Sequence, residues 1–92
     1  MKEYAVEKHL VQKTRDCGGL CFKFTSPGVA GVPDRIVILP GGKIGFVETK
    51  APGRRPRLLQ RAVIRDLYRR RCRVATIDNL KSAEGFVRRL AK

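Results

Sequence analysis

The sequence predicts an α/β fold with a mixed central sheet flanked by helices, in the element order αβββαβα. Apolar residues recur at helical spacing near both ends and in the middle of the chain. Between the first and second of these segments, two apolar runs flank Pro40-Gly41-Gly42-Lys43, which is the pattern of a β-hairpin. A further strand follows the middle helix, and a strand that returns after a helical crossover predicts a parallel pair with a right-handed connection.

The N-terminal part of the chain predicts a helix, a strand and a loop. Apolar side chains recur at helical spacing over residues 3–16, with charges between them. Gly18 and Gly19 are expected to end this helix, because glycine is common just past a helix C-terminus. Residues 20–25, with the letters LCFKFT, favour a strand, and the glycine- and proline-containing residues 26–33 favour a loop.

The two arms of the hairpin are expected over residues 35–39 and 44–47. Both are almost continuously apolar, which is typical of strands in a sheet that is covered on both faces. Residues 51–56 then predict a basic loop. We therefore expect other elements to pack on both sides of the hairpin.

The C-terminal part of the chain predicts a helix, a strand and a second helix. The helices are expected over residues 57–71 and 80–90, with the strand over 72–77 between them. The closing helix is expected to bury Ala83, Phe86, Val87 and Leu90. A chain of 92 residues without an internal repeat predicts one domain, residues 1–92, with a single modest core.

The charge balance points to a polyanionic partner. The chain has 21 Lys and Arg against 8 Asp and Glu, which gives a net charge of +13. Release of counterions makes nucleic acid the natural partner of such a chain. Charge alone does not separate DNA from RNA or from an acidic membrane surface.

Composition also disfavours several classes of protein. The longest apolar run, residues 36–39, is far shorter than the roughly 20 residues that span a bilayer. The charged N-terminus has neither an apolar signal core nor a cleavage site, so we expect a cytoplasmic protein. The three cysteines form no CxxC pair and the single histidine, His9, lies outside metal-binding spacing, which argues against a zinc site.

The open end of the predicted hairpin gathers the residues that could carry chemistry. Asp34 begins one arm, and Glu48-Thr49-Lys50 ends the other. Side chains alternate along a strand, so Glu48 and Lys50 share a face and Thr49 points away. If the hairpin loop holds an odd number of residues, Asp34 lies opposite Glu48 or Lys50 and faces the same way. With a two-residue turn the faces would disagree.

Two carboxylates so placed call for a positive partner. At about 5 Å and an effective dielectric of 20 they repel by roughly 3 kcal/mol. Magnesium relieves this repulsion, because it uses one or two carboxylates together with substrate phosphate oxygens. We expect Asp34 and Glu48 to be metal ligands, the Thr49 carbonyl a further ligand, and Lys50 the group that orients and helps deprotonate water. The alternative is an ordinary pair of strand charges, worth about 0.2–1 kcal/mol.

Three motifs follow one another along the chain: Gly31-Val32-Pro33-Asp34, Glu48-Thr49-Lys50 and Gln60. Together they resemble the PD-(D/E)xK nuclease superfamily and, more narrowly, the VRR-NUC family, the virus-type replication-repair nuclease domain. The likeness covers nearly the whole chain, including the early helix, the two glycines after it and the Lys-Ala-Pro-Gly that begins at Lys50.

This resemblance implies a minimal restriction-endonuclease-like αβββαβα core, dependence on Mg²⁺ with Mn²⁺ able to substitute, and the roles given above for the three motif residues. It also adds two catalytic positions. Glu7 matches the family's acidic residue that approaches the metal site, as a further ligand, and Gln60 matches its glutamine beside the active site. Glu3 competes with Glu7 for the first role, and either glutamate or Gln60 also fits an ordinary solvated helix position.

Basic residues near the predicted site are expected to hold nucleic acid through its phosphates, without reading bases. They are Lys23, Arg35, Arg54, Arg55 and Arg57. A second group on the middle helix fits either a solvated face or a second DNA track: Arg61, Arg65, Arg69, Arg70 and Arg71. Most of the few aromatic residues are expected in the core, which leaves few platforms for stacking single strands.

The resemblance further implies a substrate. Stand-alone members of the family look like homodimers that cut branched DNA such as four-way (Holliday) junctions, and a compact chain of this kind is typical of a phage or bacterial DNA-repair protein. We therefore expect a magnesium-dependent, structure-selective endonuclease that works as a homodimer. The alternatives are a non-catalytic basic nucleic-acid-binding module and, less favoured, a restriction-type endonuclease, for which the chain offers no domain that reads base edges.

Overall fold

The computed structural model describes residues 1–92 and has three helices and a mixed sheet of four strands in the order αβββαβα, which confirms the predicted fold class. The elements are α1 (Glu3–Asp16), β1 (Leu20–Lys23), β2 (Arg35–Leu39), β3 (Lys43–Thr49), α2 (Leu58–Arg69), β4 (Arg73–Ile77) and α3 (Leu80–Ala91). No helix combines the length and the apolar character that a membrane crossing requires.

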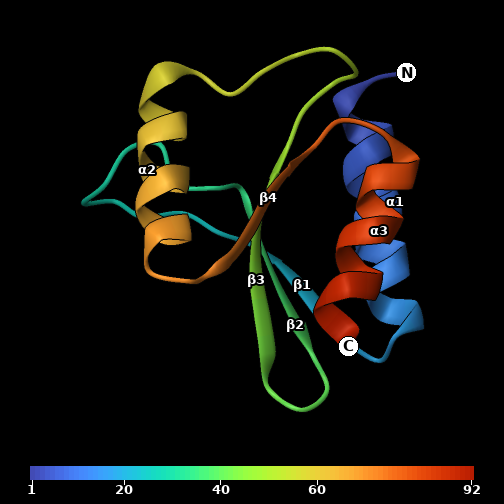
Figure 1. Cartoon of the computed structure of the whole chain (residues 1–92). Helices are drawn as coiled ribbons and strands as arrows, with labels where there is room; N and C mark the ends of the chain where they lie inside the picture. Colours follow the sequence, from blue (N-terminus) through green and yellow to red (C-terminus); the bar gives the residue numbers. More distant parts are fainter.

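The sheet has the strand order β1-β2-β3-β4 (Figure 1). The pairs β1–β2 and β2–β3 are antiparallel, and β3–β4 is parallel, with α2 as the crossover between them. This is the arrangement that the helical crossover predicted. β3 runs on to Thr49, two residues beyond the apolar run that ends at residue 47, so the strand itself carries Glu48 to the point where the chain leaves the sheet.

The hairpin register decides which side chains share a face. Leu39 pairs with Lys43, so Pro40, Gly41 and Gly42 form a loop of three residues. Both glycines have positive φ, a conformation that glycine adopts without strain. Arg35 pairs with Val47 at the other end of the ladder, and one step further along Asp34 lies opposite Glu48. The loop is therefore of the odd length for which the sequence predicted a common face.

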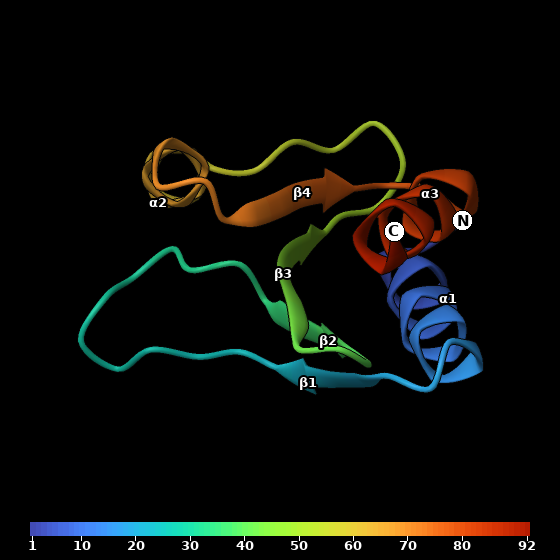
Figure 2. The same ribbon diagram turned by 60° about the horizontal axis from the view of Figure 1, so that its bottom comes forward.

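The core lies between one face of the sheet and the pair α1 and α3 (Figure 2). It contains Val6, Leu10, Val37, Leu39, Val47, Ile77, Ala83, Phe86, Val87 and Leu90, including all four residues predicted to point inward from the closing helix. Gly45 of β3 lets α3 approach closely, because a Cβ at this position would lie 2.6 Å from Cζ of Phe86. Adding side-chain volume there would push α3 away from the sheet.

The opposite face of the sheet is open, and the prediction that both faces are covered was wrong. Two of the three helices pack on the first face, while α2 contacts mainly the edge strand β4. No further helix is left to cover β1, β2 and β3 (Figure 2). We call this side of β1, β2 and β3 the open sheet face. The register places six apolar residues on it, of which Leu20, Phe22 and Ile44 are exposed and Ile36, Ile38 and Phe46 are half-buried.

The burial of the aromatic side chains also differs from the prediction. Only Phe86 is fully buried in the core. Phe24 and Phe46 are half-buried against each other on the open side, with ring centroids 5.5 Å apart. Tyr4, Phe22 and Tyr68 are exposed. The expectation that most aromatic residues lie in the core was therefore wrong, because it assumed a covered second face.

Candidate active site

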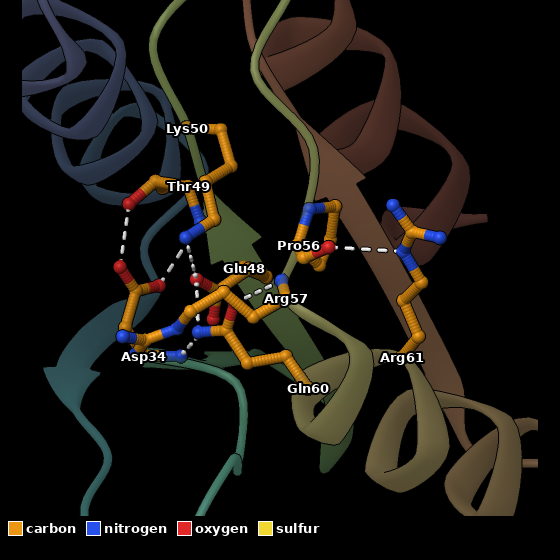
Figure 3. Close-up of polar contacts among 8 residues, drawn as sticks. All are labelled: Asp34, Glu48, Thr49, Lys50, Pro56, Arg57, Gln60 and Arg61. Carbon is orange, nitrogen blue, oxygen red and sulfur yellow. Dashed lines mark hydrogen bonds and ion pairs between the residues drawn. The ribbon is translucent and has the colours of Figure 1, made fainter.

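The two motif carboxylates meet across the hairpin, where β3 ends and β2 begins (Figure 3). The backbone N–H of Asp34 donates a hydrogen bond to Oε1 of Glu48 over 3.2 Å. Thr49 donates two hydrogen bonds back to Asp34, from its N–H to Oδ1 over 3.1 Å and from its hydroxyl to Oδ2 over 2.6 Å. These bonds fix the Asp34 carboxylate beside the end of β3.

Thr49 was expected to point away from the carboxylates, and this was wrong. Regular alternation stops after Thr49 because β3 ends there, and Asp34 lies just outside β2, so its side chain reaches around the strand end. The buried Thr49 hydroxyl thereby orients Asp34, a role that sequence reasoning missed. The hairpin register and the threonine beside the glutamate were the available signal.

Glu48 is held from two further directions. The Lys50 ammonium lies 3.1 Å from Oε2 of Glu48. The side-chain amide of Gln60 donates to the same oxygen over 2.9 Å, and its own oxygen accepts the backbone N–H of Arg57 over 3.0 Å. Figure 3 shows Gln60 reaching from the first turn of α2 to Glu48. Gln60 thus satisfies an unpaired N–H at the start of α2 and ties that helix to the site.

Burial dominates the electrostatics of both carboxyl groups. Glu48 is only 3% exposed. Desolvation raises the pKa of Asp34 above its usual value, and the hydrogen bonds from Thr49 oppose this rise. Desolvation also raises the pKa of Glu48, assisted by the charge of Asp34 and opposed by the contacts with Lys50. The charge of Asp34 therefore makes Glu48 harder to ionise, and a cation between the two carboxylates would relieve this cost.

The donors present fit a hard divalent cation. The carboxylates are oxygen ligands with unused lone pairs, since each oxygen accepts only one or two of the contacts described. No cluster of three or more His, Cys, Asp or Glu side chains is present, which excludes a cage built from side chains alone. Two carboxylates completed by a backbone carbonyl, water and substrate phosphate are the usual set for magnesium.

Glu7 faces this site but does not join the two carboxylates. Its Oε2 lies 3.2 Å from Nε of Arg35, and the Arg35 side chain is only 12% exposed. The charge of Glu7 nonetheless acts on Asp34, whose pKa it helps to raise. Arg35 is thus engaged with Glu7 through Nε, and its expected contact with a phosphate stays a prediction.

The other predicted basic residues gather on the loop before α2. Lys50, Arg54, Arg55 and Arg57 line one polar hollow together with Ala51 and Glu3. Glu3, the competitor of Glu7 at the sequence level, therefore lies beside the lysine of the motif. Lys23 is exposed at the end of β1, where it pairs with Arg35, the residue after Asp34, but it does not line this hollow. Phosphates next to the carboxylates would meet a concentration of positive charge here.

Comparison with known proteins gives two informative matches. A solved structure described as "VRR_NUC domain" superposes with a TM-score of 0.88 and 30% sequence identity, over 96% of this chain and 96% of that one. A relative from Acyrthosiphon pisum secondary endosymbiont phage 1, named "Putative nuclease p44", is 59% identical over 56 residues, or 61% of this chain. That match spans 60% of the length of the relative. No family model matches the chain.

Proposed function

This chain belongs to the VRR-NUC family of nuclease domains, and from this premise we propose that it is a magnesium-dependent endonuclease that hydrolyses phosphodiester bonds in branched DNA. The whole chain, residues 1–92, acts as one nuclease domain in this proposal. The phage origin of the similar protein supports a role in the cytoplasm of a bacterial or phage-infected cell.

One observation carries the proposal. Asp34, Glu48 and Lys50 meet at one end of the hairpin, where the Glu48 carboxylate accepts the backbone N–H of Asp34 and contacts the Lys50 ammonium, and the pKa values of both carboxyl groups are raised. A purely structural ion pair needs only one carboxylate, and a binding module needs none, because phosphates repel carboxylates. Raised pKa values in a charged, partly open site are typical of a catalytic centre.

Each residue has a defined task in the reaction. Asp34 and Glu48, with the Thr49 carbonyl, would hold magnesium, which when bound neutralises charge on the scissile phosphate and acidifies water. Lys50 orients the attacking water and stabilises the charge that develops on the phosphate. Water oxygen forms a bond to phosphorus, the P–O bond to the leaving oxygen breaks, and the proton passes to solvent or to the leaving oxygen.

The surrounding residues position this set. Gln60 keeps Glu48 in place from α2, and Thr49 keeps Asp34 in place from β3. Glu7 supplies a nearby negative charge that favours cation binding, while its ion pair holds Arg35. Phosphates flanking the cut bond contact Arg54, Arg55 and Arg57 on the loop before α2, with Lys23 as a more distant contact.

The test is a cleavage assay on end-labelled four-way junction, flap, single-stranded and linear duplex DNA, with magnesium, manganese or a chelator. We expect cutting that needs a divalent cation and favours branched substrates. Tight, salt-sensitive binding without cutting in any metal would instead support the non-catalytic binding module. Discrete fragments from linear duplex would support a restriction-type enzyme.

A homodimer is part of the same proposal, and the open sheet face is its interface. The register sets Ile38 between Leu20 and Ile44, and Ile36 between Phe22 and Phe46, so the apolar side chains form two adjoining rows. Contiguous exposed apolar surface of this kind is typical of contact sites between proteins. A second copy of the chain bears the same face, and a two-fold contact requires a self-complementary surface.

Phe22→Glu is expected to convert the dimer to a monomer, because it would place a charge inside an apolar interface. Light scattering coupled to size exclusion measures the mass of each variant. Val29→Glu is the matched control, since Val29 and Phe22 are each 51% exposed and Val29 lies on the loop between β1 and β2, outside the open sheet face. A wild-type protein that is monomeric at working concentration would contradict the dimer.

A further inference from the structure

A second hollow lies between α2 and β4, apart from the polar hollow around Lys50. It is bounded by α2, the segment before it and the edge strand β4, and is lined by Arg55, Pro56, Arg61, Ile64, Arg65, Tyr68, Val74, Ala75 and Thr76. Its floor is apolar and its rim carries three arginines. We call it the α2–β4 groove. Figure 1 shows α2 on one side of the sheet and α1 and α3 on the other.

The exposed side of α2 bears a row of positive charge. Arg57, Arg61, Arg65 and Arg69 recur every four residues, so they lie along one side of the helix with a rise of about 6 Å per step. Arg61 is anchored by a hydrogen bond of 2.9 Å from its Nε to the carbonyl oxygen of Pro56, which leaves its terminal nitrogens free. In Figure 3 Arg61 turns away from the carboxylates, unlike its neighbour Gln60.

Tyr68 gives this groove an aromatic wall. Its side chain is 71% exposed although it lies on the side of α2 that meets the apolar floor. On its other side Tyr68 borders a further hollow lined by Arg69, Arg71, Cys72 and Arg73. An exposed aromatic ring between arginines is the combination with which proteins bind unpaired nucleotides, because bases stack on the ring and phosphates meet the guanidinium groups.

The groove lies next to the polar hollow beside the candidate active site. Arg55 lines both the α2–β4 groove and the polar hollow around Lys50. Thr76, at the inner end of the groove, pairs with Glu48 across the β3–β4 ladder. A strand that leaves the cutting site past Arg57 would therefore enter the groove beside α2.

We infer that the α2–β4 groove binds an unpaired nucleotide of the DNA substrate, with its base stacked on Tyr68 and its phosphates held by Arg55, Arg61 and Arg65. This rests on the proposed function for the identity of the substrate, but not on cleavage. A groove that takes an unpaired base would favour DNA in which a single strand adjoins a duplex, as in a flap, or in which base pairs open at a branch point. Paired bases in a duplex cannot reach the ring without unstacking.

The chain offers an intrinsic probe, because it has two tyrosines, Tyr4 and Tyr68, and no tryptophan. Tyr4→Phe leaves Tyr68 as the sole tyrosine, and Tyr68→Phe leaves Tyr4. We would titrate each with a short oligothymidylate and with a matched duplex in chelator, where nothing is cut. Tyrosine fluorescence is expected to be quenched by the single strand in Tyr4→Phe and to stay unchanged in Tyr68→Phe after correction for absorbance.

Affinity provides a second readout. Tyr68→Ala is expected to raise Kd for the oligothymidylate about tenfold, as loss of one base–aromatic stack does. Kd for the duplex should change less than twofold. Tyr4→Ala is the matched control, because Tyr4 is 68% exposed but lies on α1, across the sheet from the groove. Circular dichroism confirms that each variant folds.

The outcomes separate this inference from the proposed function. If Tyr68→Ala weakens single-strand binding selectively, the inference stands even if no metal supports cleavage. If Tyr68→Ala binds both DNAs like wild type, or loses affinity for both equally, the inference is overturned even if junction cleavage is intact. Arg65→Ala should weaken binding of both DNAs and reduce its salt dependence, and an unchanged salt dependence would also overturn the phosphate contact.

Discussion

Lys50→Met is expected to lower the rate of DNA cleavage by roughly 10²–10⁴-fold, the usual contribution of a group that acts on a proton or a developing charge in the transition state. Methionine keeps the length of the side chain but removes the ammonium group that lies 3.1 Å from Glu48. DNA binding should weaken only slightly, because all but one of the 21 basic residues remain. Single-turnover cleavage and binding in chelator measure the two effects separately.

The same variant should also shift the pH dependence of cleavage. Lys50 lowers the pKa of Glu48 through its hydrogen bond and charge, so its loss lets desolvation raise that pKa further. Ionised Glu48 is then restored only at higher pH, and the residual activity should recover partly as the pH rises. Lys81→Met, at an exposed position on α3, is the matched control. Cleavage by Lys50→Met at the wild-type rate would exclude a catalytic role for this lysine.

Asp34→Asn is expected to reduce cleavage by at least about 10²-fold and yet to stabilise the metal-free protein. Loss of a residue that only supports a metal ligand costs roughly 10–100-fold, and loss of a direct ligand should cost more. Asparagine can preserve the local geometry, because its oxygen accepts the Thr49 N–H and its amide donates to the Thr49 hydroxyl. It removes only the charge whose burial is unfavourable.

The stability effect has a defined pH dependence. Burial raises the pKa of Asp34 in the folded state above its usual value of 3.8, so the folded state binds more protons than the unfolded state just above that pH. The wild-type free energy of unfolding, measured relative to Asp34→Asn, is therefore highest below pH 3.8. It falls as the pH rises through the folded pKa and stays low at neutral pH.

Thermal melts of wild type and Asp34→Asn across this pH range, in chelator, test the sign of the difference in stability. Asp34→Asn should melt above wild type at neutral pH, and the difference should shrink or reverse in acid. Magnesium should raise the melting temperature of wild type more than that of the variant, because binding to the folded state adds stability. A variant that melts below wild type by the same margin at every pH would show that Asp34 acts through its hydrogen bonds alone.

The hairpin, and the face of it that carries Glu48 and Lys50, could be predicted from sequence because both depend on local periodicity. Alternation of side chains along the strand predicted that Glu48 and Lys50 share a face. A loop with an odd number of residues is enough to place Asp34 on that face as well. The contacts that sequence missed join elements far apart in the chain. The bond from Gln60 to Glu48 spans twelve positions, and the ion pair of Arg35 with Glu7 spans twenty-eight. Such partners are set by how α1 and α2 dock on the sheet, which periodicity does not specify.

The open sheet face was missed for a related reason. An uninterrupted apolar run such as residues 36–39 predicts burial on both faces of a strand, whatever provides the cover. Within this chain, α1 and α3 pack together on one face and α2 lies at β4. The partial exposure of the apolar side chains on the other face follows from this docking of the helices, which the periodicity of the sequence does not specify.

The three-residue loop at the hairpin tip also constrains how this sequence can change over time. Insertion or deletion of one residue between Leu39 and Lys43 would turn Asp34 to the opposite side of β2 from Glu48, unless a bulge absorbed the change. Insertion of two residues would leave Asp34 and Glu48 on the same face of the hairpin. Length variation of this loop among descendants of the chain should thus occur in steps of two residues. Whether the number of loop residues is odd or even should be conserved more strictly than which residues the loop contains.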